Sequence, residues 1–149
     1  MRAEELNRKY CIAQHMENGT FIELGNRRRE GIRDAHGAIY YYVPAGERTA
    51  FHCIDCDEYW CYHTGTALDV CIIKGDEVSV VKFGAEEDAS PLLLFKKGAI
   101  FAAKSAKTAK DGTFMSCVTV PRFSYDGFTI YTDEEIKKRY PRTATFFED

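Results

Sequence analysis

Side chains that can do chemistry crowd into one short segment, Gly46–Gly65. Its central pair is His52 and Glu58. A histidine beside a carboxylate is a ready general base, because the carboxylate fixes the tautomer and stabilises the imidazolium. Other titratable side chains in the segment that can supplement this pair are Asp55, Asp57 and His63. The segment therefore predicts acid–base chemistry, and a histidine merely satisfied by a buried carboxylate is the structural alternative.

Aromatic side chains nearby offer further candidates. Trp60 lies two residues beyond Glu58 on the same predicted strand, so it shares that strand face and can stack on a ring. A core aromatic is the alternative for Trp60. A tyrosine proton donor is available from Tyr40, Tyr41, Tyr42, Tyr62 and Tyr125.

The cysteines permit a different interpretation, a structural zinc site on Cys53, Cys56, Cys61 and His63. Zinc knuckles need a second, matching pair of ligands, and the sequence holds none. The chain is not a miniprotein and shows no export signal, so disulfides are not expected either. We therefore expect the six cysteines to be reduced thiols that act as small apolar fillers.

The elements that must position these residues are mostly strands. Segments rich in Val, Ile, Thr, Phe and Tyr are separated by turn residues, which is typical of strands. They are Thr20–Leu24, Ala38–Val43, Thr49–Ile54, Glu58–His63, Ala67–Ile73, Glu77–Phe83, Leu92–Phe95, Ala99–Ala103, Thr113–Val120 and Phe128–Tyr131. Gly75 and Asp76 predict a tight hairpin turn. About ten short strands at regular spacing predict one antiparallel sandwich or barrel, over about residues 17–131.

Helices are predicted at the two ends, at about residues 4–14 and 133–140. Leu6, Tyr10 and Ala13 lie on one face of the first, and turn residues Asn18 and Gly19 follow it. Thr132 and Glu135 form a capping box at the start of the second, and Pro141 ends it. The whole chain, 1–149, is predicted to be one domain.

Composition narrows the class of protein. The formal net charge is −3, so the basic footprint of a nucleic-acid-binding protein is missing. No apolar run reaches the length of a membrane span, and Met1–Lys9 is charged and unlike a signal peptide. We expect a cytoplasmic protein whose partner is a small molecule, not a nucleic acid or a membrane.

The spacing of Gly46, His52, Glu58 and Gly65 resembles the first signature of the cupin superfamily, although Ile54 takes its second histidine position. A closer resemblance, to the cupin type-5 family, covers residues 17–141. It is carried by Glu17–Glu23, by Arg33 with Ala38–Tyr41, by His52 with Asp55, Asp57, Glu58, Trp60, His63 and Gly65, and by Val120–Phe128. The first stretch lacks the proline that opens the family's motif, and Arg122 replaces a glycine in the last.

The resemblance implies an all-β fold, a double-stranded antiparallel β-helix or jelly-roll barrel, with a ligand cavity at one mouth. It implies no single reaction, because cupins include dioxygenases, isomerases, epimerases, lyases and storage proteins. It also favours Arg33 as a cavity residue, whereas Arg27–Arg29 are expected in a solvated loop. Many cupins pair, and the apolar edge segment Leu92–Phe95 favours a homodimer.

A typical metallocupin binds its metal with three histidines and one glutamate. Here His52 and Glu58 match, whereas Ile54 and Phe101 stand at the other two positions. A stable zinc or iron site generally needs three or four protein ligands. We therefore expect no cofactor, and a divalent metal on His52 and Glu58 stays open as the alternative.

The sequence predicts a protein that binds a small sugar-like or carboxylated molecule in the barrel, and whose chemistry can be that of a metal-independent epimerase or isomerase. The candidate catalytic residues are His52, Glu58, His63 and Tyr40, and the candidate ligand-binding residues are Arg33, Asp55, Trp60 and Tyr125. Two alternatives remain, a non-catalytic binding or sensor module and a metal-dependent cupin enzyme with atypical ligands. We also expect His52 and Glu58 to lie within hydrogen-bond reach of each other, directly or through one water.

Overall fold

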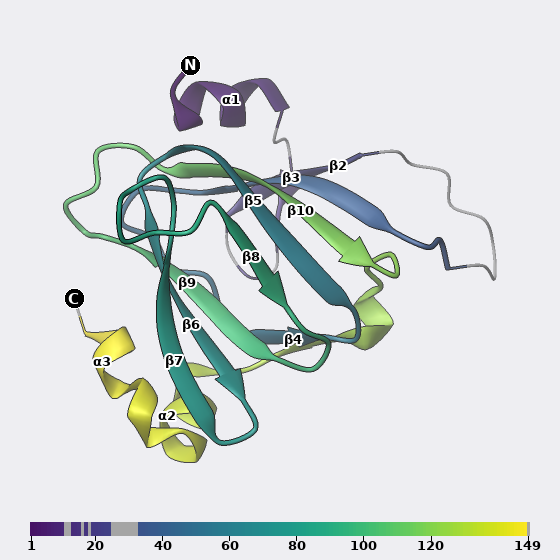
Figure 1. Cartoon of the computed structure of the whole chain (residues 1–149), viewed down its shortest axis with the longest axis vertical. Coiled ribbons are helices and arrows are strands. Elements are labelled where there is room, and N and C mark those ends of the chain that lie inside the picture. The colour runs from purple at the N-terminus through teal and green to yellow at the C-terminus, as the bar shows by residue number, and fades with distance from the viewer. Residues whose placement is uncertain (11–12, 16, 18, 25–32, 149) are drawn as a thin grey trace.

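The computed structural model describes residues 1–10, 13–15, 17, 19–24 and 33–148. Two antiparallel sheets face each other in it, as Figure 1 shows. The first has the strand order β1-β2-β3-β10-β5-β8 and the second β11-β4-β9-β6-β7. This is the jelly-roll fold predicted from the sequence. The strands are β1 (Ala13–Gln14), β2 (Thr20–Leu24), β3 (Gly37–Val43), β4 (His52–Ile54), β5 (Asp57–Gly65), β6 (Leu68–Lys74), β7 (Glu77–Phe83), β8 (Leu92–Phe95), β9 (Ile100–Ser105), β10 (Thr113–Val120) and β11 (Phe128–Ile130).

The N-terminal helix is shorter than predicted. Helix α1 is Ala3–Tyr10, and Ala13 and Gln14 are already in strand β1, where they pair with Phe21 and Thr20. Helix-forming residues alone favour a longer helix, but backbone pairing with β2 overrides that preference. Gly19, in the turn that follows, has a positive φ of 80° that favours glycine. Asn18, the other predicted turn residue, lies outside the described residues, as do Cys11 and Arg27–Arg29.

The C-terminal elements follow the capping pattern of the sequence. Helix α2 (Asp133–Arg139) begins with the predicted capping box between Thr132 and Glu135. It is followed by the short 3-10 helix η2 (Pro141–Thr143) and by α3 (Ala144–Phe147). Ile136 and Phe146 are buried against the outer face of the second sheet, so α2 and α3 cover it beside β6 and β7 (Figure 1). None of the helices in the described ranges is both long and apolar enough to cross a membrane.

The main core lies between the two sheets. Its fully buried aromatic side chains include Tyr41, Trp60, Phe83, Phe95 and Phe101, and the rings of Phe95 and Phe101 are stacked 3.9 Å apart. The predicted β6–β7 hairpin forms, with Lys74 opposite Glu77. Cys53, Cys56, Cys61, Cys71 and Cys117 are free thiols, as expected. Apolar packing fills most of the space between the sheets and leaves one end of the barrel for the cavity described below.

Candidate functional site

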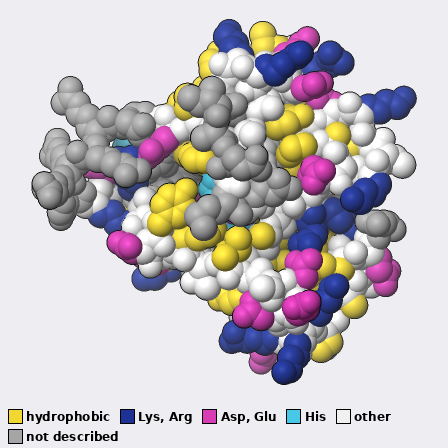
Figure 2. Space-filling model, turned by 180° about the vertical axis from the view of Figure 1, so that it is seen from behind, with side chains coloured by type: hydrophobic (Ala, Val, Ile, Leu, Met, Phe, Trp, Pro, Cys, Tyr) yellow, Lys and Arg dark blue, Asp and Glu magenta, His cyan; other side chains and the backbone are white. Residues whose placement is uncertain are grey.

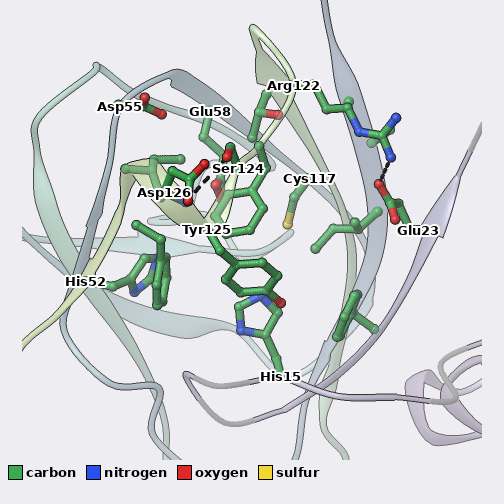
Figure 3. Close-up of a pocket in the computed structure, with 18 of the residues that line it drawn as sticks. His15, Glu23, His52, Asp55, Glu58, Cys117, Arg122, Ser124, Tyr125 and Asp126 are labelled. Carbon is green, nitrogen blue, oxygen red and sulfur yellow. Dashed lines mark hydrogen bonds and ion pairs between the residues drawn. The ribbon is translucent and has the colours of Figure 1, made fainter. Parts of the chain in front are cut away.

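A cavity of about 1010 Å³ opens where the first sheet meets the short strands β4 and β11. Its wall is built from the segment before β2, from strands β2, β3, β4, β5 and β10, and from the segment Arg122–Phe128, which includes the 3-10 helix η1 (Tyr125–Gly127). His52, on β4, and Glu58, on β5, both face it. These two strands belong to different sheets, so the cavity lies where the chain crosses from the second sheet to the first. Figure 3 shows them with His15 and Cys117 around Tyr125.

His52 is held by two acceptors at once. Its Nδ1 lies 2.9 Å from the Ala50 carbonyl oxygen, and its Nε2 lies 2.7 Å from Oε2 of Glu17. The second contact is close but poorly aligned for a hydrogen bond, so charge attraction is its main component. Because each nitrogen faces an oxygen acceptor, the ring is best satisfied as an imidazolium.

This ion pair is almost fully buried, with 3% of the His52 side chain and 7% of the Glu17 side chain exposed. Burial opposes the charge on His52, but the Glu17 carboxylate outweighs it and raises the pKa of His52. Burial likewise opposes the charge on Glu17, but His52 outweighs it and lowers the pKa of Glu17. The Tyr41 hydroxyl also donates to Glu17. Both shifts favour the ionised form of the pair.

Glu58 is a further titratable group in the cavity wall. Its Oε1 accepts a hydrogen bond of 2.8 Å from Nε1 of Trp60, the only hydrogen bond it makes within the described part of the chain. Burial, with the charge of Glu17 adding to it, raises the pKa of Glu58 to about 7. The charge of His52 and the Trp60 hydrogen bond oppose this shift without cancelling it. Glu58 is thus poised to gain or lose a proton near neutral pH.

His15 faces the same cavity as a neutral ring. The backbone N–H of Glu17 donates to its Nδ1 at 3.2 Å, so the ring proton sits on Nε2. Burial, which outweighs the nearby Glu17 carboxylate, lowers the pKa of His15. The ring is wedged edge-on against Phe21 and Tyr41, at centroid distances of 5.0 and 5.6 Å. His15 therefore offers a neutral N–H donor.

Ion pairs connect the segments at the rim of the cavity. Both terminal nitrogens of Arg33 donate to the Asp55 carboxylate, at 3.0 and 2.7 Å, and its Nε donates to the Arg122 carbonyl oxygen at 2.6 Å. Arg122 in turn pairs with Glu23 and with Asp34, and Figure 3 marks the Glu23 contact. These bridges tie the β4–β5 turn and the end of β2 to the segment after β10. In Figure 2 a histidine is visible among hydrophobic side chains near the middle of the face.

The predicted site residues fall into three groups. His52, Glu58, Arg33, Asp55 and Tyr125 line the cavity. The Trp60 ring is buried in the core behind Glu58 and reaches the site through its N–H. His63 and Tyr40 lie on the other face of the sheet, where His63 hydrogen-bonds Ser116 and Tyr40 packs against Tyr10 and Phe114. Side chains alternate along strands, so residues beside inward-facing Tyr62 and Tyr41 must point outward.

His52 and Glu58 were expected within hydrogen-bond reach, directly or through one water. They make no direct hydrogen bond in the described part of the chain, and a contact through a water stays a prediction. Glu17, from the segment before β2, takes the place of Glu58 beside the imidazole. Sequence reasoning missed Glu17, His15 and Arg122 as site residues. Glu17 and Arg122 lie within two of the stretches that carry the family resemblance, so the signal for them was present, whereas His15 lies outside those stretches.

The residues present do not fit the metal site of a typical cupin. Ile54 is buried at one ligand position, and Phe101 lies opposite His52 on β9 at the other, with its ring 4.3 Å from the imidazole. A metal on His52 and Glu58 would need a free imidazole nitrogen and an ionised carboxylate. Both nitrogens of His52 are already engaged, by Ala50 and Glu17, so the ring offers neither to a metal. Among the described residues, no three His, Cys, Asp or Glu side chains converge on a point that could hold a metal ion.

Comparisons with known proteins agree with this architecture. Residues 4–131 match the family described as "Cupin superfamily (DUF985)". A crystal structure of a Shewanella oneidensis protein is similar, with a TM-score of 0.85, 23% identity, and coverage of 97% of this chain and 94% of that one. A hypothetical protein from Leishmania major has a TM-score of 0.81 and 25% identity, with 95% and 94% covered.

Oxalate decarboxylase from Bacillus subtilis shares the fold at a TM-score of 0.62 and 14% identity, with 98% of this chain and 35% of that chain covered. A search of curated proteins gave no match. The family match spans most of the chain, and the strand order is that of a jelly roll. The chain therefore belongs to the cupin superfamily, in the family defined by the DUF985 domain.

Proposed function

We propose that this protein binds a small polar molecule in the barrel cavity and moves a proton on it without a metal, as an isomerase or epimerase does. The observation that carries the proposal is Glu58, a buried carboxyl in the cavity wall with a pKa of about 7. A general acid–base group works best when its pKa lies near the operating pH. Glu58 meets that condition, whereas His52 is tied to Glu17 and Ala50.

The proposed step balances as follows. The Glu58 carboxylate removes a proton from a carbon next to a substrate carbonyl, so that the C–H bond breaks and an O–H bond forms on Glu58. The electron pair moves to the carbonyl oxygen, which accepts a hydrogen bond from Nε2–H of His15. Return of the proton from Glu58 to the neighbouring hydroxyl-bearing carbon, with transfer of that hydroxyl's proton to the former carbonyl oxygen, completes an isomerisation. In an epimerisation the carbon instead takes a proton from water on its other face, and Glu58 releases its proton to solvent.

The other residues support this step from a distance. The His52–Glu17 pair contributes no proton, but it holds the segment before β2 against β4 and so places His15 at the cavity. Trp60 fixes one oxygen of Glu58 through its N–H. His52 and Trp60 are thus proposed as positioning residues, a different role from the general base that the sequence suggests for His52.

Hydrogen–deuterium exchange tests the proposal. The protein is incubated in D2O with short ketoses and aldoses, and carbon-bound deuterium is followed by NMR. Wild-type protein should label carbon next to the carbonyl faster than buffer alone, with a rate that rises with pH through about 7 as Glu58 ionises. Glu58→Gln should abolish labelling, whereas Tyr40→Phe, on the outer face of the sheet, should preserve it.

Two results would overturn the proposed reaction. Labelling that survives in Glu58→Gln would remove Glu58 from the chemistry. Labelling by the wild type at the buffer rate, with ligand binding intact, would leave the alternative of a non-catalytic binding or sensor module.

A further inference from the structure

We infer that the cavity selects an uncharged hydroxy-carbonyl compound over an anionic one, and that the hydroxyl of Thr119 binds a ligand hydroxyl beside Glu58. The inference rests on the proposed use of the cavity as a ligand site and narrows the substrate class. It does not require that Glu58 be catalytic, so binding and turnover can fail independently.

The first step concerns the cations of the wall. An anionic substrate is usually bound by an arginine fork that is open to it. Both nitrogens of the Arg33 fork already hold Asp55, and its Nε is used by the Arg122 carbonyl. The Arg122 fork is used by Glu23 and Asp34. Neither arginine therefore offers an open two-pronged edge to a carboxylate or phosphate, and the charge of each is already paired with a carboxylate.

The second step concerns the charge at the deep end. The imidazolium of His52 and the carboxylate of Glu17 cancel each other at a distance of 2.7 Å. His15 is neutral, and Glu58 is either neutral or negative. An anion placed there would meet no uncompensated positive charge and would repel ionised Glu58. An uncharged ligand avoids the cost of burying a charge without a partner.

The third step concerns Thr119, which lies opposite both Glu58 and Gly37 on the central strand β10. The Thr119 side chain is buried, and within the described part of the chain its Oγ1 has no well-aligned hydrogen bond and only the weakly polar Cys56 thiol as a partner. A buried hydroxyl with so weak a partner keeps most of its hydrogen-bonding capacity for a ligand or a water.

Gly37 lines the cavity beside this hydroxyl, and the Arg122 side chain packs close to it. A Cβ added to Gly37 would lie 3.4 Å from Thr119 Oγ1 and 2.9 Å from Cγ of Arg122. Any larger residue would therefore crowd the space in front of the hydroxyl. Because Thr119 can both donate and accept, it suits a ligand hydroxyl.

The fourth step concerns the apolar part of the wall. The ring centroids of Phe123 and Phe128 are 5.7 Å apart, and those of Tyr125 and Phe128 are 6.0 Å apart. All three line the cavity opposite the polar groups of β5 and β10. A hydroxy-carbonyl compound fits both sides, since its oxygens can meet Thr119 and His15 while its C–H groups contact the rings.

The test compares uncharged compounds with their anionic counterparts by saturation-transfer NMR: glyceraldehyde against glycerate, and dihydroxyacetone against dihydroxyacetone phosphate. The wild type should give signals with the uncharged members and at least about tenfold weaker binding of the anions. Thr119→Val removes the hydroxyl while keeping the volume, and it should weaken binding of the uncharged members by about tenfold, the effect of one hydrogen bond.

The matched control is Thr129→Val, on the exposed surface of β11, which should bind as the wild type does. The melting temperature of Thr119→Val should change little, because the only protein contact that its hydroxyl loses is the weak one with the Cys56 thiol. Equal or tighter binding of the anions, unchanged binding by Thr119→Val, or no binding of either uncharged compound would each overturn the inference. Failure of carbon labelling with these binding results intact would overturn only the proposed reaction.

Discussion

Glu58 makes the stability of the fold depend on pH in a way that one substitution can isolate. Its pKa is raised from 4.5 to about 7, first by burial and then by the charge of Glu17. The unfolded chain therefore releases this proton at a lower pH than the folded protein. A group of this kind contributes its full stability below the unfolded pKa, and that contribution is lost as the pH rises through the folded pKa.

The magnitude follows from the two pKa values. The interval from 4.5 to about 7, at about 1.4 kcal/mol per pH unit, amounts to about 3 kcal/mol. Glu58→Gln keeps an oxygen for the Trp60 hydrogen bond but cannot ionise. Compared with the wild type, the variant should be equally stable near pH 4.5, gain stability as the pH rises, and be about 3 kcal/mol more stable above pH 7.

Urea unfolding at several pH values between about 5 and 8 measures this difference. Trp60 is the single tryptophan and contacts Glu58, so its fluorescence reports unfolding directly. Glu77→Gln, on an exposed carboxyl at the start of β7, controls for the loss of a surface charge. A difference between wild type and Glu58→Gln that stays constant across this range would refute the reasoning, because Glu58 would then ionise like an exposed carboxyl.

Three further predictions follow from the contacts around the cavity. His52→Ala leaves Glu17 buried without its partner, so the free energy of unfolding should fall by about 3–5 kcal/mol in urea titrations, whereas His36→Ala at an exposed site should change little. Asp55→Asn breaks the Arg33 pair, whose side chains are 34% and 41% exposed, so the same measurement should show a loss below about 1 kcal/mol. Light scattering should give twice the 17.0 kDa of one chain, and Leu94→Glu, on the exposed edge strand β8, should reduce that mass to one chain. A monomeric wild type at micromolar concentration would contradict the last prediction.

The fold could be predicted closely because local patterns specify it. The strand Thr113–Val120 and the hairpin turn at Gly75 and Asp76 are set by β-branched residues and turn chemistry within a few positions. The end of the first helix could not be predicted in this way. Ala13 and Gln14 are strand residues only because β2 lies alongside them, and that pairing is absent from their local sequence.

In the candidate site too, local sequence predicts some features, whereas others depend on segments that are distant in sequence. The spacing from Gly46 to Gly65 correctly predicts that His52 and Glu58 face one cavity. The partner of His52 comes from a segment distant in sequence. Glu17 lies in a stretch that carries the family resemblance, but nothing in that stretch indicates that it pairs with His52. The outward direction of Tyr40 could not be predicted, because three consecutive tyrosines do not show which alternate residues of β3 face the core. The outward direction of His63 could be predicted, because side chains alternate along a strand and residues 58, 60 and 62 of β5 face inward.

The two residues that replace cupin metal ligands also explain the chemistry that the cavity offers instead. Phe101 covers one side of the His52 ring, and Ile54 adds apolar surface on the same strand. Neither of these two residues brings a positive charge near Glu58. Burial and the Glu17 carboxylate disfavour the ionised form of Glu58. The positive charge of His52 is paired mainly with Glu17 and only weakly with Glu58. Glu58 therefore keeps its proton up to neutral pH. Where a typical cupin has further histidine ligands, this chain therefore has apolar side chains beside a carboxyl group whose pKa lies near 7, and on that carboxyl rests the proton transfer that we propose.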